Sequence, residues 1–348
     1  MSKIVLSYLT RKGEKYLVFQ RKLRIEIINR VLIIGLSSIG DNLLITPAIK
    51  LMRDALCNAE FNIVVGPRAI EFAKGNPMFS HFYVWDKKTG MIALMKMLRY
   101  QKYDLVVDFR NSLIPFFLKS RYRLTFFTKE LFSDKFRTHE AERTLRFFIP
   151  LFGKYEKVEL YFPLTDSEIH LYFEFFKNIG VIGDRKVVMI NPGAAFEKKR
   201  WDKKNFIDAG KRIIQNYRVN IAIVGNDKEF DLAEEIRKGI DNTKVFNLAG
   251  KITFRQLAYL LSCAALLITN DTGTMHLASA MKCPVIAIFG PGNPMRYGPL
   301  GNNNIVLHTK RDCFPCVVES KCKKRFICMN DVTVDDVYAG VSQILNLG

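Results

Sequence analysis

The chain of 348 residues is 49% hydrophobic and longer than one ordinary domain, so its length and composition predict two domains. Its formal net charge of +19 at pH 7 predicts an acidic partner, whether nucleic acid, anionic lipid or a phosphorylated small molecule. No apolar stretch approaches the roughly 18–20 residues of a membrane-spanning helix, and no secretory leader is recognisable, so we expect a cytoplasmic protein.

Residues 1–30 form a basic N-terminal extension. They contain eight Lys or Arg against two Asp or Glu, interleaved with apolar side chains. A segment of this kind suits an anionic membrane surface. A helix that caps the following domain is the alternative interpretation.

Strand-like and helical patterns alternate from residue 31 to residue 160. Because the apolar runs are continuous and rich in β-branched residues, they indicate strands that are buried on both faces of a parallel sheet. The expected strands are residues 30–35, 61–66, 81–86 and 103–109. The pattern fades in a region rich in Phe, Arg and Lys, residues 122–157.

The alternation restarts at residue 186. Two such series predict two doubly wound α/β domains that face a cleft, residues 31–160 and residues 186–330, joined by a linker at residues 161–185. In such sheets ligands bind at the carboxyl ends of the strands, so the polar residues after each strand are candidate site residues. The expected strands of the second series are residues 186–193, 219–225, 244–250, 265–271 and 284–290.

The first strand of the chain is followed by GLSSIGDNLLITP, in which Gly35 and Gly40 permit a tight turn and Asp41 stands at the start of a helix. One interpretation is structural, because a carboxylate at a helix N-terminus is stabilised by free N–H groups and by the macrodipole. The other is functional, because the same surroundings keep the carboxylate ionised, as a general base requires.

Two further strands end in polar turns. In NPGAAFEKKRW, backbone N–H groups at residues 193–195 and Lys199 can neutralise a phosphate, and a solvated charge cluster is the alternative. Asp202 follows as the expected N-cap of the next helix. In IVGNDKEF, the carboxylate of Glu229 is placed to accept hydrogen bonds from a ribose diol.

The segment NDTGTMHLASAM, residues 270–281, completes the set. Asp271 or Thr272 can cap its helix, and Gly273 removes side-chain bulk. The N–H groups at this helix N-terminus form an anion site to which His276 can also donate. The absence of a G-x-G-x-x-G, Walker A or D-x-D sequence argues against a dehydrogenase, an NTPase and the usual metal-dependent sugar transferase.

Four of these stretches together resemble the ADP-heptose:lipopolysaccharide heptosyltransferases of glycosyltransferase family nine: LSSIGDNLLITPA, NPGAAFEKKRW, GNDKEF and NDTGTMHLASAMKCPVIAIFGPGNP. The resemblance implies a GT-B fold, with the acceptor on the N-terminal domain and the nucleotide sugar on the C-terminal one. It implies inverting transfer without a metal or other cofactor. It also implies that a C-terminal helix, residues 331–348, packs back on the N-terminal domain.

The resemblance also assigns roles to individual residues and partners. Asp41 matches the catalytic base, Lys199 the lysine on the donor phosphates and Glu229 the acid on the ribose. The implied partners are ADP-heptose and an anionic lipid-linked saccharide, with peripheral contact at the cytoplasmic face of the inner membrane and no nucleic acid. The residues that match the donor-binding loop are Asp271, Thr272, Gly273 and His276.

Two alternatives to this function stay open. The charge and an aromatic, basic stretch at residues 122–161 suit a nucleic-acid-binding protein, although no RNP, KH or helix-turn-helix signature is present. A family member that transfers a sugar other than heptose is the second alternative.

The seven cysteines divide into a cluster and three isolated residues. The cluster has the spacing C-x₂-C-x₅-C-x₅-C. These cysteines could bind zinc, but the spacing lacks the paired short C-x₂-C knuckles of strong zinc patterns, so we expect no metal there. The clustered residues are Cys313, Cys316, Cys322 and Cys328. The isolated ones, expected in the core, are Cys57, Cys263 and Cys283.

Overall fold

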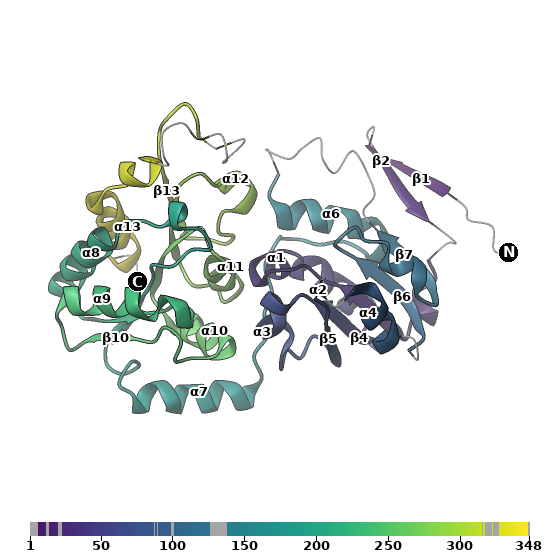
Figure 1. The fold of residues 1–348 in the computed structure, drawn as a ribbon, viewed down its shortest axis with the longest axis horizontal. Coiled ribbons are helices and arrows are strands. Elements are labelled where there is room, and N and C mark those ends of the chain that lie inside the picture. The colour runs from purple at the N-terminus through teal and green to yellow at the C-terminus, as the bar shows by residue number, and fades with distance from the viewer. Residues whose placement is uncertain are drawn as a thin grey trace. The chain divides into compact units, whose positions relative to one another are not determined.

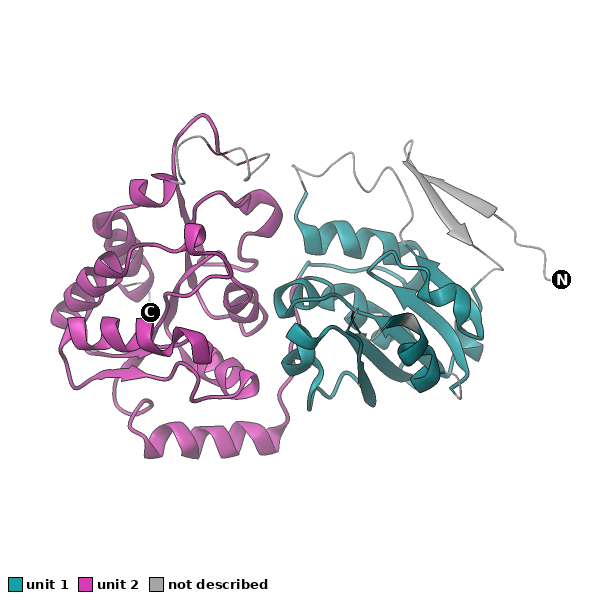
Figure 2. Cartoon of the chain, in the orientation of Figure 1, with its two compact units in different colours: residues 1–158 teal, residues 159–348 magenta. Residues whose placement is uncertain are grey.

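The computed structural model describes most of the chain, in two compact units of residues 1–158 and 159–348 (Figure 2). In the described part, no helix is both long and apolar enough to cross a bilayer. The described residues are 6–11, 14–19, 23–86, 88, 90–98, 101–125, 138–314, 316, 322 and 327–346.

The first unit is built on a five-stranded parallel sheet whose strand order is β5-β4-β3-β6-β7 (Figure 1). The three central strands are almost wholly buried, as continuous apolar runs predict. The strands are β3 (Arg30–Ile34), β4 (Glu60–Val65), β5 (His81–Val84), β6 (Tyr103–Asp108) and β7 (Ser120–Thr125).

Two short strands precede this sheet. β1 (Leu6–Arg11) and β2 (Glu14–Phe19) form an antiparallel pair, so the capping helix considered for the N-terminal extension is not what the structure has there. The sequence pattern also missed β7. Its residues, SRYRLT, alternate between partly exposed and buried positions, because β7 lies at the edge of the sheet.

Helices connect the strands of the first unit. The first of them, α1, begins directly after the turn that follows β3, and Ser38 caps it by accepting a hydrogen bond from the backbone N–H of Asp41. The helices are α1 (Ile39–Leu44), α2 (Thr46–Ala55), α3 (Ile70–Ala73), α4 (Gly90–Leu98), α5 (Ile114–Phe117) and α6 (Glu140–Phe152), with 3₁₀ turns η1 (Ile25–Ile27) and η2 (Pro67–Ala69).

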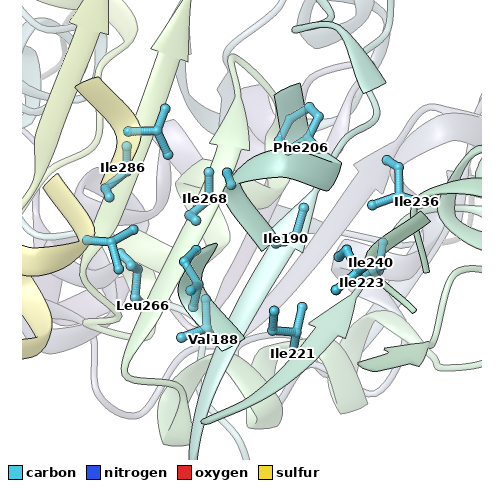
Figure 3. Close-up of a cluster of buried hydrophobic side chains, with 14 of the residues drawn as sticks. Val188, Ile190, Phe206, Ile221, Ile223, Ile236, Ile240, Leu266, Ile268 and Ile286 are labelled. Carbon is cyan, nitrogen blue, oxygen red and sulfur yellow. The ribbon is translucent and has the colours of Figure 1, made fainter. Parts of the chain in front are cut away.

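The second unit contains a six-stranded parallel sheet in the order β10-β9-β8-β11-β12-β13. Isoleucine and valine side chains from neighbouring strands form one buried cluster with Phe206 of the helix above them (Figure 3). The strands are β8 (Lys186–Asn191), β9 (Val219–Ile223), β10 (Val245–Asn247), β11 (Leu266–Asn270), β12 (Val285–Phe289) and β13 (Ile305–His308).

The helices of the second unit begin at the residues that cap them. Asp202 caps α8 through the backbone N–H of Lys204, as predicted, and Thr253 forms a capping box with Gln256 at the start of α10. The helices are α7 (Asp166–Asn178), α8 (Lys203–Asn216), α9 (Phe230–Ile240), α10 (Phe254–Cys263), α11 (Gly273–Ala280), α12 (Pro294–Tyr297) and α13 (Val334–Asn346), with 3₁₀ turns η5 (Glu197–Lys199), η6 (Asp227–Glu229) and η8 (Ile327–Asp331).

Two expectations about this unit differ from the structure. The segment 161–185, expected as a linker, contains α7, which packs on α10 within the second unit. The last helix, α13, was expected to pack back on the first domain. Instead Val337, Val341 and Leu345 enter the core cluster of the second unit, because their apolar face covers β11, β12 and β13.

The strand orders place each site. In both sheets the first strand of the series lies in the middle. The next two strands in the chain are added on one side of it, and the strands after those are added on the other side, so the strand order reverses beside β3 and beside β8. Ligands of doubly wound sheets bind at this switch point, outside the carboxyl ends of the strands. In the first unit the switch point lies between β3 and β6, and in the second it lies between β8 and β11.

Candidate functional site

The loops after β8 and β11 meet at the switch point of the second unit. The two strands are hydrogen-bonded neighbours, and Asn191 at the end of β8 pairs in register with Thr269 near the end of β11. The loop with Lys199 therefore leaves the sheet beside the loop with Asp271, although 72 residues separate them in the sequence.

An ion pair joins these two loops. The ammonium Nζ of Lys199 lies 2.8 Å from Oδ2 of Asp271, and the side chains are 18% and 13% exposed. A pair this far from solvent is screened less than a surface pair, so it holds the long lysine side chain in one place. Asp271 thereby positions a cation at the start of α11.

Two asparagine side chains fix the shapes of the loops. The amide of Asn270 donates to the carbonyl oxygens of Pro192 and Gly193, and its oxygen accepts from the backbone N–H of Trp201. The oxygen of Asn191 accepts from the N–H of Gly193 at 3.2 Å. The N–H of Gly193, which we expected to face a phosphate, therefore forms a hydrogen bond within the loop. Asn270 was not among the predicted site residues, because its only signal in the sequence is its place at the end of a buried strand.

The N-terminus of α11 carries the remaining residues of the predicted donor loop. Thr272 occupies the N-cap position, and its hydroxyl interacts with Asn191 at 3.2 Å and with Thr269 at 3.3 Å rather than with the helix N–H groups. Gly273 is the first helical residue. The N-terminal N–H groups and the macrodipole therefore give this end partial positive charge. His276, one turn further, is buried with 5% exposure.

Glu229 has a structural partner as well as a predicted ligand. Its Oε2 accepts the backbone N–H of Asn226 at 2.9 Å in a capping box, and the side chain is 9% exposed. A methyl group added at Gly193 would collide with the same carboxylate, so Glu229 lies directly against the turn after β8. The structure thus brings the predicted ribose acid to the loop that leads to Lys199.

The predicted base lies in the other unit. Asp41 is exposed, one position after Gly40 in the first turn of α1, and its Oδ2 accepts the hydroxyl of Ser38 at 2.7 Å. The strand that leads to it, β3, ends at the switch point of the first sheet. The carboxylate of Asp41 is therefore accessible from solvent.

Two polar side chains, one buried and one partly buried, hold the turn before Asp41, and their role there could not be predicted from the sequence. Asn42 has no exposed area, and its amide both accepts from the N–H of Leu36 and donates to the carbonyl of Leu36, each at 2.9 Å. The guanidinium of Arg110 donates to the carbonyls of Gly35 and Leu36 and lies over the ring of Trp85. Burial lowers the pKa of Arg110. These contacts fix the backbone from which α1 starts.

Asp108 keeps Arg110 in place. Its carboxylate has no exposed area and accepts the backbone N–H of Arg110 at 2.8 Å and the N–H and hydroxyl of Ser112. Burial raises the pKa of Asp108, and the hydrogen bonds from Ser112 and Arg110 oppose that rise. Asp108 is therefore a positioning residue for the loop after β6.

The clustered cysteines line one small cavity in the second unit. Its volume is about 20 Å³, and Thr309, Arg311 and Phe314 also line it. Burial and the charges of the neighbouring thiols raise the pKa of Cys328. Among the residues that the structure describes, no group of three or more His, Cys, Asp or Glu side chains is arranged to hold a metal ion.

The isolated cysteines were expected in the core. Cys283 is buried, but Cys57 and Cys263 are exposed, so the expectation is wrong for two of the three. Cys57 follows the end of α2 and Cys263 is the last residue of α10, and side chains at helix ends often face solvent.

Sequence comparisons identify relatives over most of the chain. A family model described as glycosyltransferase family 9 (heptosyltransferase) matches residues 91–326. Lipooligosaccharide heptosyltransferase 2 of Campylobacter jejuni is 27% identical over 88% of this chain and 95% of its own length. Lipopolysaccharide heptosyltransferase 3 of Escherichia coli K12 is 25% identical, also over 88% of this chain and 95% of its own length.

Solved structures have the same fold. A family 9 glycosyltransferase from Veillonella parvula superimposes with a TM-score of 0.76 at 19% identity, covering 92% of this chain and 98% of its own. The ADP-heptose lipopolysaccharide heptosyltransferase II of E. coli has a TM-score of 0.73 at 19% identity, covering 91% and 99%. The two parallel sheets and these neighbours confirm the predicted GT-B fold. The chain belongs to glycosyltransferase family 9, and it is a glycosyltransferase.

Proposed function

We propose that the enzyme transfers a heptose from ADP-heptose to the core saccharide of lipopolysaccharide or to a related lipid-linked acidic saccharide. The observation that carries the proposal is the Lys199–Asp271 pair beside the N-terminus of α11, at the switch point of the second sheet. The relatives named above as heptosyltransferases support the choice of heptose.

The second unit holds the donor in this proposal. Its diphosphate binds beside Lys199 and the N–H groups that begin α11, and Glu229 accepts hydrogen bonds from the ribose. Thr272 and Gly273 shape the loop, and His276 contributes a further donor from within the helix. As the bond between the sugar and the diphosphate breaks, negative charge grows on the leaving nucleoside diphosphate, and these fixed positive groups stabilise it without a metal.

Asp41 of the first unit completes the reaction. The acceptor hydroxyl oxygen forms a bond to the anomeric carbon from the face opposite the leaving group, which inverts the configuration. Asp41 takes the proton of that hydroxyl, and the electron pair of the broken bond stays on the diphosphate. General-base catalysis of this kind contributes about 10²–10⁴ in rate.

The acceptor accounts for the charge of the chain. Lipopolysaccharide core saccharides carry carboxylates and phosphates and are attached to a lipid, so a chain with a net charge of +19 is attracted to them and to the anionic surface around them. We place the enzyme in the cytoplasm, in peripheral contact with the inner membrane.

A panel of nucleotides tests the donor. We expect ADP and ADP-heptose to raise the melting temperature, because a ligand at 100 times its Kd stabilises a protein by about 2.7 kcal/mol, whereas UDP and GDP leave it unchanged. Transfer to purified core acceptor should persist in EDTA. Stabilisation by UDP or GDP alone would assign another nucleotide sugar, and salt-sensitive RNA binding that ADP does not affect would favour the nucleic-acid alternative.

A further inference from the structure

Helices α4 and α5 present an unusual set of apolar side chains to solvent. Isolated exposed hydrophobic residues are ordinary, but a group of them on one face of a protein marks an interaction site. We call this group the α4–α5 face. It consists of Ile92 (75% exposed), Met97 (44%), Leu113 (58%), Phe116 (49%) and Phe117 (63%).

The inner sides of the two helices show that these residues share one side of the first unit. Leu94 and Leu98 of α4 and Ile114 at the start of α5 lie in a single buried cluster with β3 and β6. Both helices therefore cover the same face of the sheet. Their outer, exposed side chains point away from that shared cluster.

A buried carboxylate and a partly buried guanidinium hold the α5 segment in place. At its start, Asp108 accepts the N–H and the hydroxyl of Ser112, as described above. At its end, the guanidinium of Arg123 donates to the carbonyl of Pro115 at 2.7 Å and to that of Leu118 at 2.8 Å. The exposed phenylalanines are thus displayed from a fixed turn, which lowers the entropic cost of inserting them elsewhere.

The charge around the face is predominantly positive. Residues 87–123 contain nine Lys or Arg and two Asp. One of the two aspartates, Asp108, is buried, so Asp104 is the one that opposes the basic side chains at the surface. Exposed basic side chains in this stretch include Lys96, Lys119 and Arg121.

We propose that the α4–α5 face docks on an anionic lipid bilayer, with its apolar side chains in the headgroup and upper acyl region and its basic side chains on lipid phosphates. Aromatic and aliphatic residues rimmed by Lys and Arg are the chemistry that such a surface binds. A second copy of the chain fits less well, because it would set like charges opposite each other. The docking face gives a location to the membrane contact of the proposed function. It depends on that function in one respect, that the acceptor is attached to a lipid.

Vesicle flotation tests the apolar part of the proposal. The full chain is mixed with vesicles of phosphatidylethanolamine and phosphatidylglycerol, or of phosphatidylcholine alone, without donor or acceptor. The double variant Phe116→Ser, Phe117→Ser should bind the anionic vesicles at least about tenfold more weakly, because two rings no longer leave water. The matched control is Leu171→Ser, Phe173→Ser on α7, whose side chains are 63% and 38% exposed, and it should bind as the unchanged chain does.

A second double variant tests the contribution of the basic side chains to membrane binding. Lys119→Gln, Arg121→Gln should weaken binding to anionic vesicles and leave weak binding to phosphatidylcholine unchanged, and 0.5 M salt should have the same effect. Equal binding by the Phe116, Phe117 variant and its control would overturn the docking face. So would light scattering that shows a dimer in the unchanged chain and a monomer in that variant.

An activity assay separates this inference from the proposed function. With a deacylated, water-soluble core acceptor, the Phe116, Phe117 variant should transfer heptose as fast as the unchanged chain. Loss of vesicle binding with full activity on the soluble acceptor supports the docking face. Vesicle binding that depends on the two phenylalanines, in a chain that transfers no heptose, would leave the face intact and refute the heptosyl donor.

Discussion

The switch points of the two sheets are built alike but hold their carboxylates differently. In each unit a buried asparagine fixes the loop that follows a central strand: Asn42 of α1 holds the turn after β3, and Asn270, the last residue of β11, holds the loop after β8. In the second unit the carboxylate of Asp271 is paired with Lys199. In the first unit Asp41 is exposed, and its carboxylate accepts a hydrogen bond from the hydroxyl of Ser38.

This difference separates two roles for an aspartate in the same kind of loop. The carboxylate of Asp271 is engaged by the ammonium group of Lys199, so Asp271 suits positioning. The carboxylate of Asp41 is exposed and accessible, so Asp41 suits general-base work. Substitutions in the two loops should therefore affect different kinetic constants.

The largest effect is expected for Asp41→Asn. The amide keeps the shape of the side chain but cannot take a proton, so kcat should fall by about 10²–10⁴. Stability should change little, because the side chain is exposed. Single-turnover transfer and ADP titration measure this. The counterpart Asp271→Asn should weaken ADP binding instead, and an Asp41→Asn enzyme with near-normal kcat would refute the base assignment.

Lys199→Met should have the next largest effect. Removing one fixed positive group from the leaving diphosphate should lower kcat by about 10²–10³ and weaken donor binding as well. Lys198→Met is the matched control, because Lys198 belongs to the same 3₁₀ turn but lies over the ring of Phe196. If both variants lose the same activity, general charge rather than the paired lysine acts on the donor.

The strands and the site loops could be predicted from the sequence for a physical reason. Continuous β-branched runs occur where both faces of a strand are buried, and polar residues after such runs collect at one edge of a parallel sheet. The ends of such runs mark the loop with Lys199 and the start of α11 in the sequence. The pairing of Lys199 with Asp271 could not be predicted, because the partners lie 72 residues apart.

Other features were out of reach of sequence patterns. The spacing of Val337 and Val341 shows that α13 has an apolar face, but periodicity does not say which sheet that face covers, and the family resemblance named the wrong one. Asn42 was missed, and Arg110 was considered as an acceptor contact or a surface charge rather than as a support of the turn, because both roles depend on packing beneath that turn. A single polar residue in a sequence carries no mark of such packing.

Two glycine substitutions, one in each unit, are expected to have effects of intermediate size on the kinetic and binding constants. A methyl group at Gly35 would lie 2.6 Å from Oδ1 of Asn42, and one at Gly193 would collide with the carboxylate of Glu229. Gly35→Ala should therefore disturb the turn before Asp41 and lower kcat about tenfold, while Gly193→Ala should raise the donor Kd about tenfold. Isothermal titration with ADP separates the two, and equal changes in Kd would contradict the division of roles.

The smallest effect on transfer is expected for Glu168→Gln, which tests the stability of the second unit away from its switch point. Glu168 on α7 pairs with the buried guanidinium of Arg255 on α10. Burial alone would raise the pKa of Glu168, but hydrogen bonds from Arg255 and Thr165 outweigh it and lower that pKa to about 2. Replacing the carboxylate should cost about 2 kcal/mol of unfolding free energy and leave kcat unchanged at temperatures well below melting.

The pH dependence of this loss has a defined sign. Because the folded pKa lies below the unfolded value of about 4.5, the carboxylate stabilises the fold fully above that pH and progressively less as the pH falls toward 2. Urea unfolding at pH 7 should thus separate Glu168→Gln from the unchanged chain, and the gap should narrow on acidification below pH 4.5. A gap that stays constant down to pH 3 would mean that packing of α7, rather than ionisation of Glu168, supplies the stability.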